Sequence, residues 1–475
     1  MGEVHQMVNA EDQGEAQREE RVHPPHHQAV EQLLGEHAGC LAEARPDGGG
    51  RFVGTRRTLG MRGPGGLSHE RSHGAIVRVI THHHHGKVWK MPPSFFTWSC
   101  WMKRRLSVLT LSLLAAFAAK AEEILIGVPV SLTGTYAFVG TAAVKGLQHA
   151  VDEINTGNEL GAGRSIKLVI VDDGSNNNQA ITLVNRLANV DKVMAIAGPS
   201  ASPTVLAASP VVNQLQVPML GIAVTTAVNK AGPWSNRILN SPATLMTALT
   251  NYTLTSYKPK SVMTVASRDN DGAAAQSKVA RSVMEGKVTL MPEESALMAE
   301  TDFSALTTKI ASTKPDVVMI TMNDAAAANI LLQSRQAGVP ASVRFVANNA
   351  AASASFLRIG GKAVEGVLVG TDAFPEIRTD ALARNFVANF QKRYNAIPDQ
   401  WNAVGYTIGR LYGHAIANAK SPLTRQSLLD SLVNIKNFPV VLGSGKGNFS
   451  FAAEREPTYE PILITIKDGK FTPAP

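Results

Sequence analysis

Cysteine is almost absent from this 475-residue sequence, since it has only two and both lie in the first 101 residues. The rest of the chain therefore has no disulfide framework and no thiol for nucleophilic catalysis or zinc binding. Histidine is scarce in the same part, because 11 of the 13 histidines lie in residues 1–101 and only His149 and His414 follow. A chain of this kind must be stabilised by a hydrophobic core.

Nucleotide-binding and catalytic motifs are also missing. No G-x-x-x-x-G-K-[ST] sequence occurs, and the glycine-containing loop 131–140 lacks the G-x-G-x-x-G pattern of dinucleotide-binding proteins. Ser-His-Asp catalysis needs a positioned base, whereas His149 falls within an expected helix, where we predict an exposed side chain. The four contiguous histidines at 82–85 lack the spacing of a shaped metal site. We expect no catalytic residue, no metal and no cofactor.

No apolar run reaches the roughly 18–20 residues that a membrane span needs. The longest run, 106–119, follows the basic residues 103–105 and precedes a small-x-small sequence at 119–121. This order is typical of a secretory signal peptide. We therefore predict a signal peptide at 102–121 and an exported mature chain from residue 122. Residues 1–101 are expected to be mistranslated upstream sequence or a disordered extension.

Charge of one sign is not concentrated in the part of the chain that is expected to fold. The whole sequence has 46 Lys and Arg against 38 Asp and Glu, a formal net charge of +8. After residue 121 these counts are 31 and 27. So small an excess gives little attraction for a nucleic acid, and no nucleic-acid partner is expected.

From residue 122 onward, apolar strands alternate with amphipathic helices. The first strand is expected at 124–130, and the helix after it repeats apolar residues at i, i+3, i+4 and i+7 from Leu147. Strands that are apolar throughout, each followed by such a helix, predict an α/β fold with parallel sheets covered on both faces. The alternation restarts after Pro242, which predicts two lobes. Later elements are expected as helices at 379–394 and 402–419 and as a hairpin turning at 467–470.

Two loops at expected strand ends carry hydroxyl groups, and in open α/β sheets ligands bind at the carboxyl ends of strands. In the first loop, Ser202 is expected to cap a helix whose first residue is Pro203. This arrangement is either a capped helix alone or an anion site at the helix N-terminus. In the second loop, Thr225 and Thr226 follow the next strand, so that one anion could contact both loops.

Three further loops carry polar residues. The loop 267–272 resembles a calcium loop, but its twelfth position is Lys278 in place of the Glu that such a site requires. We therefore expect an exposed loop there. The pairs 323–324 and 348–349 follow two later strands, where Asn and Asp serve equally well as helix caps or as parts of a site.

Six segments of the chain resemble, in sequence, order and spacing, the periplasmic solute-binding proteins of the branched-chain amino acid ABC transporter family. The resemblance covers nearly all of residues 122–475. The six segments are IGVPVSLTGTYAFVG, GLQHAVDEIN, VDDGSNNNQAITLVNRL, AIAGPSAS, VPMLGIAVTT and ILLQSRQAG.

This resemblance implies a type I periplasmic binding fold, in which two Rossmann-like lobes are joined by a three-crossing hinge. One lobe would comprise residues 122–241 and 374–442, and the other would comprise 242–373 and 443–475. A solute would bind between the lobes, which would close over it. The closed protein, expected to be a monomer, would then dock on the membrane permease of an ABC transporter.

The family's carboxylate site would fall, position by position, on Ser202, Ala223 and Thr225, through backbone N–H and hydroxyl groups. Ser200 and Tyr136 belong to the same group of loops, and we expect them in the ligand site as well.

The positions that contact the ammonium group and line the rest of the pocket in that family carry other residue types here. The acidic residue that pairs with the ligand ammonium would fall at Asn349, and pocket-lining aromatic residues would fall at Val139, Asp271 and Asn323. Asparagine lacks the charge that a desolvated ammonium group needs, although Asp271 or Asp324 could replace it from another side. The sequence therefore predicts a carboxylate-bearing solute, either a branched-chain amino acid or an aromatic or aliphatic acid without an ammonium group.

Other functions would need features that the sequence does not present. A ligand sensor of the same fold would need an attached output domain, a DNA-binding regulator would need a helix-turn-helix, and an α/β enzyme would need a nucleophile with its base. Substrate binding for an ABC importer is therefore the favoured function, and a sensor is the alternative.

Overall fold

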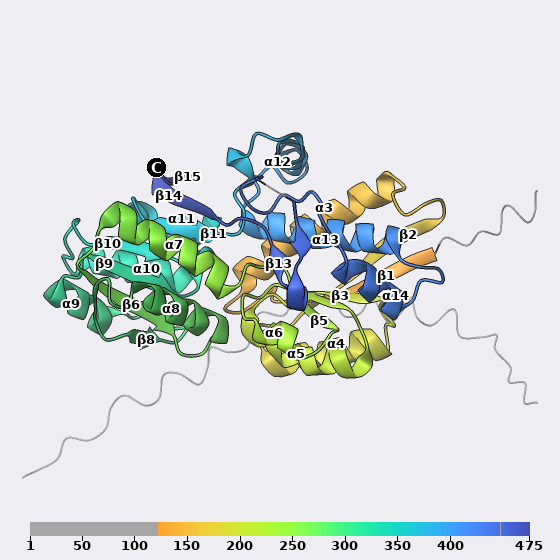
Figure 1. Ribbon diagram of the computed structural model, residues 1–475, viewed down its shortest axis with the longest axis horizontal. Helices are drawn as coiled ribbons and strands as arrows, with labels where there is room; N and C mark the ends of the chain where they lie inside the picture. The colour runs from red at the N-terminus through yellow and green to blue at the C-terminus, as the bar shows by residue number, and fades with distance from the viewer. Residues whose placement is uncertain (1–121, 447) are drawn as a thin grey trace, which may run out of the picture. The chain divides into compact units, whose positions relative to one another are not determined.

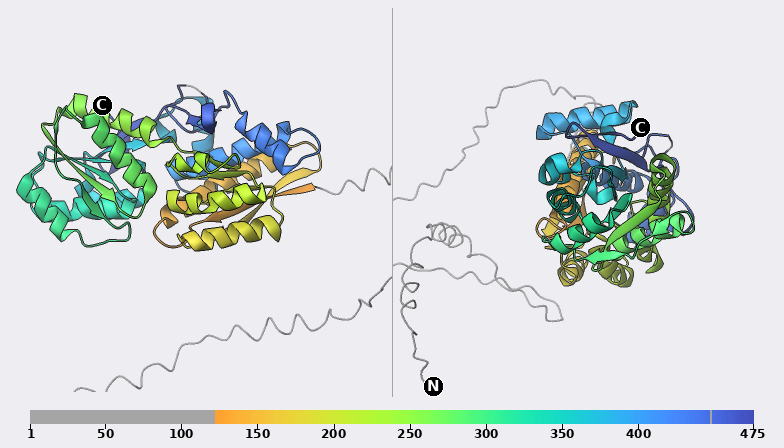
Figure 2. Two further views of the ribbon diagram at one scale, coloured as in Figure 1. Left: turned by 60° about the horizontal axis from the view of Figure 1, so that its bottom comes forward. Right: turned by 90° about the vertical axis from the view of Figure 1, so that its left-hand side faces the viewer.

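The computed structural model describes residues 122–446 and 448–475 (Figure 1). The predicted signal peptide at 102–121, the extension at 1–101 and the histidine run at 82–85 lie outside these residues. The described chain has an α/β fold with two main sheets, each covered by helices (Figure 2). This confirms the predicted fold class.

The first sheet has the strand order β2-β1-β3-β4-β5, and every pair in it is parallel. Its strands are β1 (Glu122–Val130), β2 (Arg164–Asp172), β3 (Ala195–Ala197), β4 (Met219–Gly221) and β5 (Ser235–Arg237). The helices around it are α3 (Ala137–Thr156), α4 (Asn177–Asn189), α5 (Ser202–Leu215), α6 (Ala227–Lys230), α12 (Ala381–Tyr394), α13 (Gln400–Asn418) and α14 (Arg425–Val433). The predicted helices at 379–394 and 402–419 are thus α12 and α13, within two residues at each end.

Successive side chains of a strand point to opposite faces of the sheet. Because β1 is apolar at consecutive positions, it places apolar side chains on both faces. Ile124 and Ile126 of β1 pack in one core with residues of α3 and α13, whereas Leu125 packs in another core with residues of α4 and α5. We call this sheet and its helices the first lobe.

Two glycines allow helices α3 and α13 to approach closely. A Cβ atom on Gly146 would lie 1.9 Å from the carbonyl oxygen of Asn402, and one on Gly405 would lie 1.9 Å from that of Ala143. A side chain at either position would force the helices apart. This contact fixes the start of α13, where Trp401 lies.

The second sheet is mixed, with the order β15-β14-β11-β10-β9-β6-β7 and with β8 also paired to β6. Its strands are β6 (Ser261–Ser267), β7 (Thr289–Leu290), β8 (Glu294–Ala296), β9 (Val317–Thr321), β10 (Arg344–Ala347), β11 (Leu368–Thr371), β14 (Ile462–Lys467) and β15 (Lys470–Pro473). Its helices are α7 (Pro242–Tyr257), α8 (Asp271–Met284), α9 (Ser304–Thr313), α10 (Asp324–Gln336) and α11 (Ala354–Gly360), with 3-10 turns η1 (Asn349–Ala351), η2 (Gly361–Val364) and η3 (Pro375–Ile377). We call this unit the second lobe; its antiparallel β14–β15 pair is the predicted C-terminal hairpin.

The C-terminal segment is shared between the lobes. The prediction assigned all of residues 443–475 to the second lobe, but Phe449 and Phe451 are buried in the core of the first. There β12 (Ser450–Phe451) pairs with β13 (Pro457–Thr458), beside the short turn η4 (Ala453–Arg455). The chain enters the second sheet only at β14. The apolar residues of this segment are too few to show a periodicity that would identify their partner.

A buried carboxylate joins the three places where the chain passes between the lobes. Asp372 follows β11 and is fully buried, and its Oδ1 accepts hydrogen bonds from the backbone N–H of Asn240 at 3.0 Å and from the hydroxyl of Tyr459 at 2.8 Å. The backbone N–H of Gly443 donates to the Asp372 carbonyl at 2.8 Å. Burial raises the pKa of Asp372. The hinge is thus held by one side chain with partners far apart in sequence.

Two predictions about helices need correction. His149 is only 5 % exposed, because the aromatic rings of α12 and α13, including Phe390 and Tyr406, surround it. Burial lowers its pKa. Helix α7 was not predicted, although Ser241 accepts a hydrogen bond from the backbone N–H of Thr244 as its N-cap and Pro242 begins it. Among the described helices, none is long and apolar enough to cross a membrane.

Candidate ligand-binding pocket

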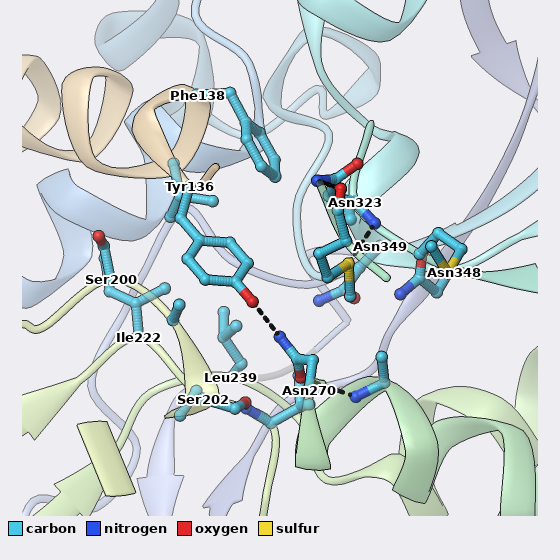
Figure 3. A pocket seen from close by; sticks show the side chains of 18 of the residues that line it. Tyr136, Phe138, Ser200, Ser202, Ile222, Leu239, Asn270, Asn323, Asn348 and Asn349 are labelled. Carbon is cyan, nitrogen blue, oxygen red and sulfur yellow. Dashed lines mark hydrogen bonds between the residues drawn. The ribbon is translucent and has the colours of Figure 1, made fainter. Parts of the chain in front are cut away.

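A pocket lies between loops of the first lobe and loops of the second (Figure 3). It encloses about 480 Å³, part of which is open to solvent. The first lobe contributes Tyr136, Phe138, Val139, Ser200, Ala201, Ser202, Ile222, Ala223, Val224, Leu239 and Trp401. The second contributes Asn270, Ala273, Gln276, Met298, Met322, Asn323, Asn348, Asn349 and Ala350. None of these described lining residues carries a charged side chain.

The first-lobe wall is built from the loops after β3 and β4. The hydroxyl oxygen of Ser202 accepts a hydrogen bond from the backbone N–H of Val224 at 3.2 Å, and that of Ser200 accepts one from the backbone N–H of Ser131 at 2.9 Å. Neither hydroxyl proton has an acceptor among the described residues, so both can donate to a ligand. The N-terminus of α5 opens into the same space, where backbone N–H groups favour an anion.

Ser202 does not have the capping role predicted for it. The N-cap of α5 is Ala201, Ser202 is the first helical residue, and no side chain caps this helix. The Ser202 hydroxyl instead bridges to the β4 loop, a contact between residues 22 positions apart that local sequence cannot reveal.

Seven of the nine predicted site residues line the pocket and two do not. The seven are Tyr136, Val139, Ser200, Ser202, Ala223, Asn323 and Asn349. Thr225 is buried beside the pocket, where its hydroxyl accepts a hydrogen bond from the backbone N–H of Ala227 at 3.4 Å. Asp271 is exposed at the start of α8, and its neighbour Asn270 lines the pocket instead.

The second-lobe wall carries five carboxamide side chains, of which two, Asn270 and Gln276, were not among the predicted candidates. Asn270 caps α8 and donates to the hydroxyl of Tyr136 at 3.0 Å, a bond that joins the two walls (Figure 3). Asn323 caps α10, as one of its two predicted roles, and donates to the carbonyl of Met298 at 2.8 Å. The strand-end position and capping signal of Asn270 could have identified it.

Three of these carboxamides form a hydrogen-bonded chain, which we call the amide chain: Asn348, Gln276 and Asn349. Asn348 donates to Gln276 at 2.8 Å, Gln276 donates to Asn349 at 3.1 Å, and Asn349 donates to Asp372 at 2.7 Å. Asn349 stands where the family's acidic residue would fall, and its side chain is bonded to the hinge carboxylate of Asp372.

Aromatic rings form the body of the first-lobe wall. Phe138 and Trp401 meet edge to face with centroids 5.8 Å apart, and Tyr136 lies opposite Asn270. Val139 lines the pocket where an aromatic residue was expected, and the aromatic ring is supplied one residue earlier by Phe138. Burial raises the pKa of Tyr136, so its hydroxyl stays neutral near pH 7.

The described part of the chain contains no group of three or more His, Cys, Asp or Glu side chains that could hold a metal ion. In the loop 267–272, which resembles a calcium loop in sequence, the carboxylate of Asp269 accepts a hydrogen bond from the hydroxyl of Ser267 at 2.6 Å.

Comparison with known proteins identifies the family. A family model described as periplasmic binding protein matches residues 123–469. The chain belongs to the periplasmic binding protein family. A Leu/Ile/Val-binding protein from Rhizobium johnstonii is 30 % identical to this periplasmic binding protein over 218 residues, which is 45 % of this chain and 59 % of the relative. The matched part thus spans about three fifths of that relative's length.

Solved structures support the same fold. A leucine-binding protein from Thermotoga maritima superposes on this periplasmic binding protein with a TM-score of 0.69 at 23 % identity, covering 74 % of this chain and 98 % of the other. An ABC transporter solute-binding protein from Rhodopseudomonas palustris, in complex with benzoate, gives a TM-score of 0.64 at 21 % identity, covering 74 % and 95 %. The fold is that of a type I periplasmic binding protein.

Membership of this family confirms the predicted class of protein. This periplasmic binding protein is a solute-binding protein and not an enzyme, and its family implies an extracytoplasmic location.

Proposed function

We propose that this protein is the substrate-binding protein of an ABC importer and captures a small carboxylate-bearing solute between its two lobes. The observation that carries this proposal is the first-lobe wall, where two hydroxyl groups and the N-terminus of a 14-residue helix open into an uncharged pocket between the lobes. Hydrogen-bond donors without a positive charge are suited to hold a carboxylate that must later be released.

The relatives support a carboxylate as the shared feature of the ligand. One relative is named for leucine, isoleucine and valine, and one structural neighbour holds benzoate. These compounds have different bodies, but each has a carboxylate group and an apolar portion. The donors of Ser200 and Ser202 suit the first, and the rings of Tyr136, Phe138 and Trp401 suit the second.

Closure would follow from contacts that exist only when the lobes are together. The ligand would touch both walls, and the bond from Asn270 to Tyr136 would join them directly. A ligand with contacts to both lobes shifts the population toward the closed state by its difference in affinity for the two states. The closed monomer would then present both lobes to a membrane permease, after export through the signal peptide at 102–121.

Matched ligands would test the carboxylate. We expect 4-methylpentanoate or benzoate to raise the melting temperature of the purified protein, and 4-methylpentan-1-ol or benzyl alcohol to leave it unchanged. If no carboxylate in a broad panel binds, or if an alcohol binds as tightly as its acid, the proposed function is wrong.

The variant Ser202→Ala would test the proposed carboxylate contact. Loss of a hydrogen bond to a charged group costs about 1.5–3 kcal/mol, so we expect affinity for the acid to fall roughly 10- to 100-fold by titration calorimetry. Ser312→Ala is the matched control, because Ser312 is an exposed serine on α9. Equal affinities of the two variants would remove Ser202 from the site.

A further inference from the structure

One glycine at the start of helix α8 lies directly against the first lobe. Gly272 is the second residue of α8 and is buried. A Cβ atom on Gly272 would lie 2.4 Å from the Oγ of Ser202, 2.9 Å from the Cβ of Ser202 and 2.8 Å from the Cγ2 of Val224. Both of these residues belong to the first-lobe wall of the pocket. The three atoms nearest to the missing side chain thus all come from the other lobe.

The backbone conformation of Gly272 does not require glycine. The residue lies within the α-helix, and it is not among the described glycines with a positive φ. Glycine is one of the poorest helix formers and alanine is the best, and the three residues after Gly272 are all alanines. Since no left-handed conformation explains this glycine, the space that it leaves for the first lobe is its physical explanation.

The atoms that face Gly272 are held in place by the first lobe. The Oγ of Ser202 accepts a hydrogen bond from the backbone N–H of Val224 at 3.2 Å, so a rotation of this hydroxyl would break a contact of the first-lobe wall. The Cβ of Ser202 is fixed by the backbone of α5. Its distance of 2.9 Å from an added Cβ is well inside the carbon–carbon contact distance of about 3.5–4.0 Å. An added methyl group would therefore push the two lobes apart.

Gly272 differs in this respect from the close-approach glycines of α3 and α13. Gly146 and Gly405 bring together two helices of one lobe, so a side chain there would disrupt that lobe whether or not the lobes close. The contact of Gly272 is made across the lobes, close to the hydrogen bond from Asn270 to Tyr136. A side chain at Gly272 would therefore penalise the closed state and not the fold of either lobe.

Resting on the proposed function, we propose that Gly272 sets how far the lobes close over the solute. Its missing side chain lets the start of α8 reach the loops that carry Ser202 and Val224, and any side chain there would hold the lobes apart. A ligand drives closure only by its difference in affinity for the two states. An obstruction confined to the closed state therefore lowers ligand affinity and leaves the unliganded protein as stable as before.

Titration calorimetry of the purified protein with benzoate and with 4-methylpentanoate would measure this effect. Overpacking by one methyl group costs enough to reduce an affinity about 5- to 100-fold, and we expect a loss in this range for Gly272→Ala with each acid that binds the wild type. The melting temperature of the unliganded variant should not fall, because alanine favours the helix.

Ala274→Gly is the matched control, since Ala274 is exposed in the first turn of the same helix and does not line the pocket. It makes the reverse exchange between glycine and alanine. Its melting temperature should fall slightly, while its affinity for the acids should stay unchanged. Opposite results in the two variants would separate lobe closure from the stability of α8.

A pair of cysteines would test the contact without any ligand. Disulfides need Cβ atoms about 3.5–4.5 Å apart, so Ser202→Cys combined with Gly272→Cys should form one when the lobes approach to within about 1 Å of the described contact. We expect mild oxidation to produce this bond, identified by mass spectrometry as a linked pair of peptides. Gly272→Cys alone is the control, and the peptide masses distinguish the bond from any that involves Cys40 or Cys100.

The outcomes separate this proposal from the proposed function. If acids bind the wild type and Gly272→Ala equally well, or if the unliganded variant loses much of its stability, the role in closure is overturned while carboxylate capture stands. Failure of the cysteine pair to crosslink would also overturn it. If the crosslink forms but no acid in a broad panel binds the wild type, the proposed function fails and the contact between the lobes stands.

Discussion

The two walls of the pocket differ in how their polar groups are held. On the first-lobe wall, Ser200 and Ser202 each accept one backbone hydrogen bond and keep a proton to donate. On the second-lobe wall, the amide chain uses most of its hydrogen-bonding capacity on itself and on Asp372. The first wall therefore suits a group that many ligands share, whereas the amide chain of the second wall is largely committed to contacts within the protein.

The walls also differ in what fixes them to the fold. The first wall depends on the start of α13, where the side chain of Asp399 accepts hydrogen bonds from the backbone N–H groups of Trp401 and Asn402, both at 3.0 Å. The second wall depends on the hinge carboxylate of Asp372. Three substitutions test this difference.

The largest effect is expected from Asp372→Ala, which breaks the anchor of the second wall. It leaves donors of Asn240, Tyr459 and Asn349 buried with fewer acceptors. We expect the free energy of unfolding to fall by about 3–4 kcal/mol, measured by urea denaturation. Hydrogen exchange should increase more in β11 and η1 than in the loops after β3 and β4.

The control for this variant is Asp372→Asn, which keeps an acceptor of similar shape and should lose less stability. If Asp372→Ala loosens both walls equally, the two walls do not have separate anchors.

The next effect concerns the anchor of the first wall and depends on pH. Burial raises the pKa of Asp399 to about 6. A carboxyl group with a raised pKa contributes stability below its unfolded value near 4 and loses that contribution as the pH rises through 6. Asp399→Asn does not titrate and still caps the helix. Its unfolding free energy relative to wild type should therefore rise by about 2–3 kcal/mol between pH 4 and 7.

Denaturation curves of both proteins across this pH range would measure the difference. A parallel pH dependence of wild type and variant would show that Asp399 does not titrate in this window.

The smallest effect is expected at the bond that joins the walls. Tyr136→Phe removes the hydroxyl that accepts from Asn270 at 3.0 Å and keeps the ring. A neutral hydrogen bond contributes about 0.5–1.5 kcal/mol, so ligand affinity should fall about two- to tenfold while the unliganded melting temperature changes little. Titration calorimetry would measure the affinity, and thermal unfolding would measure the melting temperature of the unliganded protein. An unchanged affinity would mean that this bond does not assist closure.

Much of the pocket could be predicted from residue type and position, and the misses have physical causes. Ser200, Ser202 and Ala223 follow apolar strands, so their position at one sheet edge follows from the parallel topology. Asp271 was wrong by one residue, because the exact start of a helix decides which side chain faces the pocket, and Asn270 lines it instead. Val139 does line the pocket, but the aromatic ring expected there belongs to Phe138. Adjacent helical residues point about 100° apart.

The role of Asn349 could not be predicted at all from its neighbours in sequence. Its amide bonds to Gln276, 73 positions away, and to Asp372, 23 positions away. The burial of His149 has a similar cause, because the rings around it come from α12 and α13.

The sequence by itself determined the alternation of strands and helices, the two lobes and the loops where a ligand would bind. Local periodicity and strand-end residues carry that information, because burial of apolar faces dictates them residue by residue. Only the tertiary structure decided which polar side chains remain free in the pocket and which are used by the hinge. Hydrogen bonds between distant segments depend on the packing of whole lobes, and no local pattern records them.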